Sequence, residues 1–132
     1  MTSPSEDRMR EEVLVLEKLA LRWAVLAAWS EELDKRGVAV GGVVGPQLTA
    51  VRTKLATGTF SSCEVGCDLT AIEGTLTARD AESPAESVDF WLELLGETMA
   101  EKPATEELLR YPPVKFYYMN CGLACACKPL ES

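Results

Sequence analysis

The feature that most constrains this chain is a long segment near its start that is apolar on nearly every side of a helix. The eleven residues from Leu19 to Trp29 contain a single charge, Arg22. A surface helix carries one apolar stripe, so a helix that is apolar around most of its circumference must lie inside a bundle or at a subunit interface. Eleven residues are too few to span a bilayer, which needs about 20. The sequence therefore predicts a mostly α-helical fold without a membrane segment.

Local signals mark the ends of the expected helices. The segments Ser3-Pro4-Ser5-Glu6 and Ser83-Pro84-Ala85-Glu86 each combine a capping serine, a proline at the first helical position and a glutamate at the third. Ser61 begins a third capping box, and Gly37 is typical of the left-handed residue that ends a helix. With the apolar periodicity, these signals predict helices over residues 4–36, 46–57, from 61 onward, 84–101 and 104–111.

Two segments allow another interpretation. A small β-hairpin turning at Glu73-Gly74 is the alternative to the third helix, because glycine weakens a helix interior. Residues 114–119 are aromatic and strand-like, and the sequence leaves open whether residues 114–127 form strand, helix or coil. The glycine-rich residues 37–45 follow a helix and lack the Gly-Lys-Ser/Thr ending of a phosphate-binding loop, so we interpret them as a connector.

The expected architecture is one domain over residues 1–132, a length that suits a single core. It is a helical bundle of four to five helices with the long N-terminal helix at its centre. A Cys-rich, partly extended C-terminal tail completes it. We also expect a homodimer in which Trp23 or Trp29 is buried against a second copy, because so few helices leave part of the first helix uncovered.

Composition excludes several classes of function. The chain has no histidine, which excludes Ser-His-Asp triads, Cys-His dyads and histidine-ligated metal motifs. A net charge of −8 opposes binding to nucleic acid. The acidic stretch from Glu64 to Glu107 is either a solvated face or a docking surface for a basic partner. The first twelve residues are polar and unlike a targeting peptide, so we expect a cytoplasmic protein.

The five cysteines form the candidate site. Cys63 and Cys67 are four residues apart on an expected helix, so their side chains lie one above the other. They lie opposite the apolar stripe of that helix, where a buried structural cysteine is not expected. The other three cysteines, Cys121, Cys125 and Cys127, are all in the C-terminal tail. We therefore expect the tail to pack against the face that carries the first pair.

Four interpretations of this cluster stay open. The thiolates bind zinc, or they hold an iron–sulfur cluster, since each takes four such ligands. Alternatively there is no cofactor, and the disulfides Cys63–Cys125 and Cys67–Cys121 form, with Cys127 free. The chain has one Asn and one Gln, a depletion reported for hyperthermophile proteins, whose cytosolic proteins do carry disulfides. In the fourth interpretation the cysteines are unrelated small apolar residues.

The function predicted from these residues is a small helical structural or interaction module stabilised by the cysteine cluster. The alternative is a small redox or electron-transfer protein that uses the same thiols. We expect no catalytic residues and no enzyme activity, because the acidic neighbours of Cys63 oppose thiolate formation. Three consecutive aromatic residues, Phe116, Tyr117 and Tyr118, cannot all face inward from a strand, so at least one should contact a protein partner.

Overall fold

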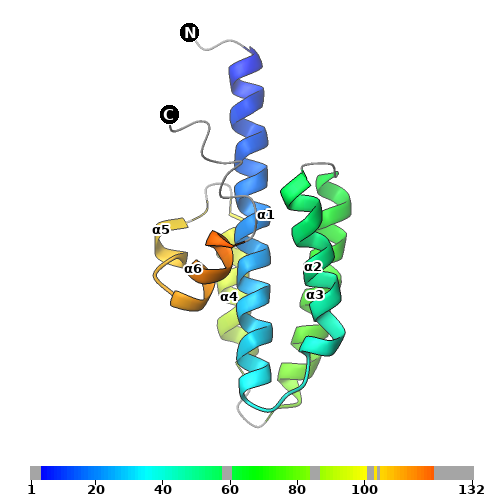
Figure 1. The fold of residues 1–132 in the computed structure, drawn as a ribbon. Coiled ribbons are helices and arrows are strands. Elements are labelled where there is room, and N and C mark those ends of the chain that lie inside the picture. The colour runs from blue at the N-terminus through cyan, green and yellow to red at the C-terminus, as the bar shows by residue number, and fades with distance from the viewer. Residues whose placement is uncertain (1–3, 58–60, 84–86, 101–102, 104, 121–132) are drawn as a thin grey trace.

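The structure is a computed structural model that describes residues 4–57, 61–83, 87–100, 103 and 105–120, with side chains from residue 14 onward. Within these ranges it contains six helices and no strand. The helices are α1 (Pro4–Lys35), α2 (Gly41–Thr57), α3 (Ser62–Ala81), α4 (Val88–Thr98), α5 (Thr105–Leu108) and α6 (Pro112–Met119). The mostly α-helical fold is confirmed, with the long first helix at its centre (Figure 1).

Helix α1 is covered from two sides. Helices α2 and α3 pack along one side of it and α4 and α6 along the other (Figure 1). As a result the residues from Leu19 to Trp29 are buried, apart from Arg22. Trp23 and Trp29 keep only 5% and 0% of their surface exposed. The chain's own helices cover both tryptophans, so the prediction that a second copy covers one of them is wrong. The homodimer itself stays a prediction.

Polar side chains of α1 reach past the apolar core to its edge. The Nη2 of Arg22 donates to the hydroxyl of Thr70 on α3 at 3.0 Å, so the one charge in the apolar stretch extends along the helix surface. On the other side, the hydroxyl of Thr105 donates to the Glu17 carboxylate at 2.6 Å and attaches α5 to α1. None of the helices in the described ranges has the length and hydropathy needed to cross a membrane.

Two predicted helix ends are confirmed by their backbone geometry. Gly37 has a φ of +86°, the left-handed conformation that glycine adopts without a Cβ clash, and α1 ends two residues before it. At the start of α3, the hydroxyl of Ser61 accepts the backbone N–H of Glu64 at 3.1 Å. Helix α3 then continues without a break through Glu73 and Gly74, so the alternative β-hairpin is wrong.

Helix α2 begins at Gly41, five residues earlier than predicted. The Oδ1 of Asp34 accepts the backbone N–H groups of Val40 and Gly41, at 3.0 and 3.1 Å, and so caps this helix from the end of α1. A Cβ on Gly41 would lie 2.6 Å from the Oδ2 of Asp34, which explains glycine at this position. Pro46 lies inside α2, where it removes one backbone hydrogen bond without ending the helix.

Helix α4 begins at Val88 and ends at Thr98, inside the predicted range of 84–101. Residues 84–86 lie outside the described part of the chain. Ser87 occupies the position before the helix but makes no side-chain cap, because its hydroxyl donates to the buried carboxylate of Asp80. A tertiary contact therefore sets this helix start, which local capping signals could not predict.

The strand-like segment near the C-terminus is helical. Helix α5 ends at Leu108, three residues before the predicted end at Tyr111, and Pro112 and Pro113 occupy the first two positions of α6, where a missing N–H costs nothing. Residues 114–119 belong to α6, so the expectation of an extended tail is wrong for them. Packing of Val114 against the core, where it is 1% exposed, outweighs the β-propensity of the aromatic residues. Residues 121–132 lie outside the described ranges.

Candidate functional site

The first cysteine pair lies on the surface of α3. Both Cys63 and Cys67 are exposed free thiols, one turn apart on the helix. The buried side of α3 is formed by the predicted apolar residues, Val65, Leu69, Ile72 and Leu76. The prediction that the two cysteines face away from this stripe is confirmed. Next to them on the same surface, the Nζ of Lys54 from α2 contacts the carboxylates of Glu64 and Asp68 at 2.7 and 2.9 Å.

The other three cysteines, Cys121, Cys125 and Cys127, lie outside the described residues. The predicted convergence of the tail on α3, the two disulfides and the zinc or iron–sulfur ligand set all depend on them. Among the residues that the structure does describe, no three His, Cys, Asp or Glu side chains lie close enough together to hold a metal ion. Cys63 and Cys67 alone supply two of the four thiolates that zinc or a cluster requires.

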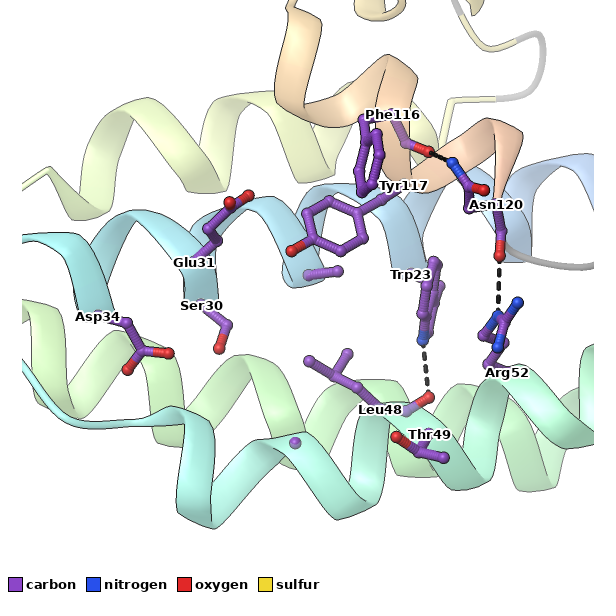
Figure 2. A pocket seen from close by; sticks show the side chains of 12 residues that line it. Trp23, Ser30, Glu31, Asp34, Leu48, Thr49, Arg52, Phe116, Tyr117 and Asn120 are labelled. Atoms are coloured by element: carbon purple, nitrogen blue, oxygen red, sulfur yellow. Dashed lines mark hydrogen bonds between the residues drawn. The ribbon is translucent and has the colours of Figure 1, made fainter.

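A second candidate site is a groove between α1, α2 and α6, which has a volume of about 460 Å³ (Figure 2). This volume falls within the range of about 300–1,000 Å³ typical of ligand pockets. Its lining comes from helices that are far apart in the sequence. The residues are Trp23, Ala27, Ser30, Glu31, Asp34, Gly45, Leu48, Thr49, Arg52, Phe116, Tyr117 and Asn120.

Aromatic rings form one wall of this groove. The rings of Trp23 and Tyr117 meet edge to face with centroids 6.0 Å apart, and Phe116 meets Tyr117 in the same way at 5.3 Å. The indole N–H of Trp23 donates to the carbonyl of Leu48 across the groove at 2.9 Å, which locks the ring in place (Figure 2). Phe116 is 60% exposed although it is apolar. The wall is rigid at its base and open to solvent at its rim.

The two ends of the groove carry opposite charge. Glu31 and Asp34 of α1 lie at one end, and Arg52 of α2 lies at the other (Figure 2). Burial raises the pKa of the Tyr117 phenol above its ordinary 10.0, and the charge of Glu31, a hydrogen bond to Glu31 and the charge of Asp34 raise it further. The Nε of Arg52 donates to the carbonyl of Asn120 at 2.8 Å, so α2 is connected to the end of α6.

A buried carboxylate joins three helices on the other side of α1. Asp80 of α3 is 0% exposed and accepts the indole N–H of Trp29 at 2.7 Å. It also accepts the backbone N–H and the hydroxyl of Ser87 at 3.0 and 2.9 Å, and Arg36 lies 3.5 Å away. These contacts make Asp80 a structural connection between α1, α3 and the start of α4.

Sequence reasoning missed both the groove and Asp80. Asp80 continues the apolar stripe of α3, four residues after Leu76, and a carboxylate at such a position is the signal that could have revealed it. The groove has no comparable local signal, because its walls come from three separate helices. The three adjacent aromatics did indicate a surface contact, and Phe116 is the one most exposed to solvent, whereas Tyr117 and Tyr118 pack partly against the core.

Comparisons of this chain with protein-family models, with curated proteins and with solved structures found no match.

Proposed function

We propose that this protein is a small helical interaction module whose binding site is the groove between α1, α2 and α6. The observation that carries the proposal is the groove's aromatic wall, in which an exposed Phe116 continues the half-buried ring of Tyr117 and the buried ring of Trp23. Aromatic residues at the rim of a preformed concave site are typical of surfaces that bind a partner.

Rigidity of the site supports the proposal. Trp23 donates to the carbonyl of Leu48, and Arg52 donates to the carbonyl of Asn120, so α2 is connected to α1 and to the end of α6 before any partner binds. Asp34 is held by its contacts with the first backbone N–H groups of α2. A preorganised site loses little conformational entropy on binding.

The test is an NMR titration with a library of small apolar and charged fragments. The chain has three tryptophans, and each gives a separate indole N–H signal. Fragments that occupy the groove should shift the Trp23 signal and leave Trp29 and Trp91 unchanged, since those two rings stack on each other elsewhere, 6.1 Å apart. Phe116→Ala should weaken the binding of these fragments. The control is Phe90→Ala, which replaces an exposed phenylalanine on α4 and should leave their binding unchanged. Binding that never shifts Trp23 would contradict the proposal.

A second part of the proposal concerns the cysteines. We propose that Cys63 and Cys67, with Cys121, Cys125 and Cys127, form a thiol site that stabilises the module, either around zinc or an iron–sulfur cluster or as paired disulfides. Its support is the exposure of the first two thiols one turn apart and away from the core, where small apolar residues have no packing role. A redox role for the same thiols is the competing function.

Metal analysis and thiol titration of anaerobically purified protein distinguish these states. Bound zinc without colour supports a structural site, and a brown protein supports an iron–sulfur cluster and the redox role. Two disulfides leave one titratable thiol, because the chain has five cysteines. Five titratable thiols without metal would contradict the thiol site. Serine in place of both Cys63 and Cys67 should abolish any metal binding.

A homodimer and a cytoplasmic location complete the proposal. Several large apolar side chains are exposed on the single chain, among them Phe90, Leu92 and Met99 on α4. Such side chains favour an interface when they lie together on one surface. Sedimentation at micromolar concentration tests the dimer, and a monomer near 14.4 kDa would contradict it.

A further inference from the structure

We infer that Cys63 and Cys67 of α3 form by themselves a binding site for a soft monovalent metal ion, Cu(I). The inference goes beyond the proposed function, because it requires neither the groove nor the cysteines of residues 121–132. The spacing of the two thiols, the rigidity of the helix that carries them and the number of ligands they offer support it.

The spacing of the two thiols suits a shared metal ion and not a direct bond. Cys63 and Cys67 are exposed free thiols one turn apart on α3. Cβ atoms four residues apart on a helix are separated by about 5–6 Å. A disulfide requires Cβ atoms about 3.5–4.5 Å apart, so the two thiols cannot join each other while α3 stays helical. A metal ion allows the wider separation, because two metal–sulfur bonds of about 2.3 Å each replace one S–S bond of about 2.05 Å.

Helix α3 holds this spacing fixed. The hydroxyl of Ser61 caps its first turn by accepting the backbone N–H of Glu64 at 3.1 Å. Val65, between the two cysteines, and Leu69, just beyond them, are both 0% exposed on the opposite, buried side of the helix. A site whose ligands are held in place before the metal arrives loses little conformational entropy on binding.

The pair offers two ligands, and the neighbouring carboxylates are engaged elsewhere. The Nζ of Lys54 contacts Glu64 at 2.7 Å and Asp68 at 2.9 Å, and so connects both carboxylates to α2. Among the described residues, no third Cys, Asp or Glu side chain completes a metal site with the pair. Zinc takes four ligands, and this pair alone would leave it half-coordinated. Soft thiolates select Cu(I), which two of them satisfy, so the number of ligands favours copper.

The surface beside the thiols is open to an incoming ion. A Cβ on Gly66, the residue before Cys67, would meet no atom from elsewhere in the described chain within 4 Å. Copper replaces the proton of each thiol when it binds, so one Cu(I) ion and two thiols give a bis-thiolate with one negative charge and two released protons. The net charge of −8 attracts the cation to the protein.

The experiment measures Cu(I) binding by the full chain in which Cys121, Cys125 and Cys127 are replaced by serine. Oxygen is excluded, ascorbate keeps the copper monovalent, and bicinchoninate, which forms a coloured complex with Cu(I), competes for the ion. We expect one Cu(I) ion per chain and no change of size on sedimentation. Zn²⁺ should bind at least about tenfold more weakly than Cu(I), the change that about 1.4 kcal/mol produces.

Three variants of this chain test the two ligands. Cys63→Ser should weaken Cu(I) binding by more than about a hundredfold, which exceeds the about 10–100-fold that loss of a supporting residue costs. Cys67→Ser combined with Ala71→Cys should weaken it as much, because the two exposed thiols are then eight residues, or about 12 Å, apart. Ala71→Ser alone is the matched control and should leave the affinity unchanged.

Several results would overturn the inference. If the chain without the other three cysteines binds no Cu(I), the pair alone is not a site, and zinc held by all five cysteines of the native chain would still support the proposed thiol site. Equal affinity after Cys67→Ser with Ala71→Cys would show that the spacing is irrelevant. A loaded protein that sediments as a dimer would show that copper bridges two copies, and tighter binding of Zn²⁺ would refute the argument from ligand number. Alanine in place of serine at the three positions repeats the measurement if the serine form loses its helical circular dichroism.

Discussion

Replacing Asp80 with alanine removes the buried carboxylate that connects α1, α3 and the start of α4. The variant leaves the indole N–H of Trp29, 2.7 Å from the lost oxygen, without its acceptor. It also removes both hydrogen bonds to Ser87 and the charge opposite Arg36. Removing one partner of a buried charged pair costs about 3–5 kcal/mol. Hydrogen bonds to a charged group contribute about 1.5–3 kcal/mol each, but they do not add within one network.

We therefore expect Asp80→Ala to lower the free energy of unfolding by about 3–5 kcal/mol, out of the about 5–15 kcal/mol of an ordinary domain. Urea unfolding at neutral pH, followed by circular dichroism, measures the change. The control is Asp68→Ala on the same helix, whose carboxylate is 40% exposed and pairs with Lys54. An exposed pair should cost less than about 1 kcal/mol. If Asp80→Ala and Asp68→Ala both lower the free energy of unfolding by less than about 1 kcal/mol, the buried network does not stabilise this fold.

Acid provides a second measurement of the same group. Burial alone would raise the pKa of Asp80, but the hydrogen bonds from Ser87 and Trp29 and the charge of Arg36 outweigh it and hold the pKa below its ordinary 3.8. The stability from this depressed pKa is present above pH 3.8 and is lost as the pH falls through the lower pKa of the folded chain. Asp80→Asn removes this contribution, so the difference in unfolding free energy between the native and variant chains should shrink below pH 3.8. If the difference in unfolding free energy between the two chains does not change with pH, the depressed pKa does not belong to Asp80.

Three further predictions test other parts of the structure. The raised pKa of Tyr117 contributes stability that is present below pH 10.0 and is lost as the pH rises through the pKa of the folded chain. The Tyr117→Phe variant should therefore lose less unfolding free energy at alkaline pH than the native chain, as measured by urea unfolding. Gly41→Ala places a Cβ 2.6 Å from Asp34 and should displace the α2 cap, at a cost of about 0.5–2 kcal/mol. Leu69→Ala, at a fully buried position, should cost about 2–5 kcal/mol, whereas Arg79→Ala, at an exposed position of the same helix, should stay within about 0.5 kcal/mol by the same assay.

Part of the candidate site was predictable and part was not. The surface position of Cys63 and Cys67 followed from the periodicity of α3, because residues four apart share a face whatever else the chain does. The groove could not be predicted, since Trp23, Arg52 and Phe116 come from three helices whose packing brings them together. The strand-like reading of residues 114–119 failed for a related reason. Their β-propensity is weak next to the burial of Val114 and the two prolines that begin α6.

The sequence by itself determined the helical class, the central place of α1 and the ends of helices marked by Ser61 and Gly37. These depend on the apolar pattern and on contacts within a few residues, which act in any tertiary arrangement. Only the tertiary structure decided where α2 and α4 begin, because Asp34 and Asp80 set these starts through side-chain contacts that depend on how the chain turns. The burial of Asp80 depends on Trp29, which is 51 residues away in the sequence. Contacts over such separations exist only after packing, so no local pattern encodes them.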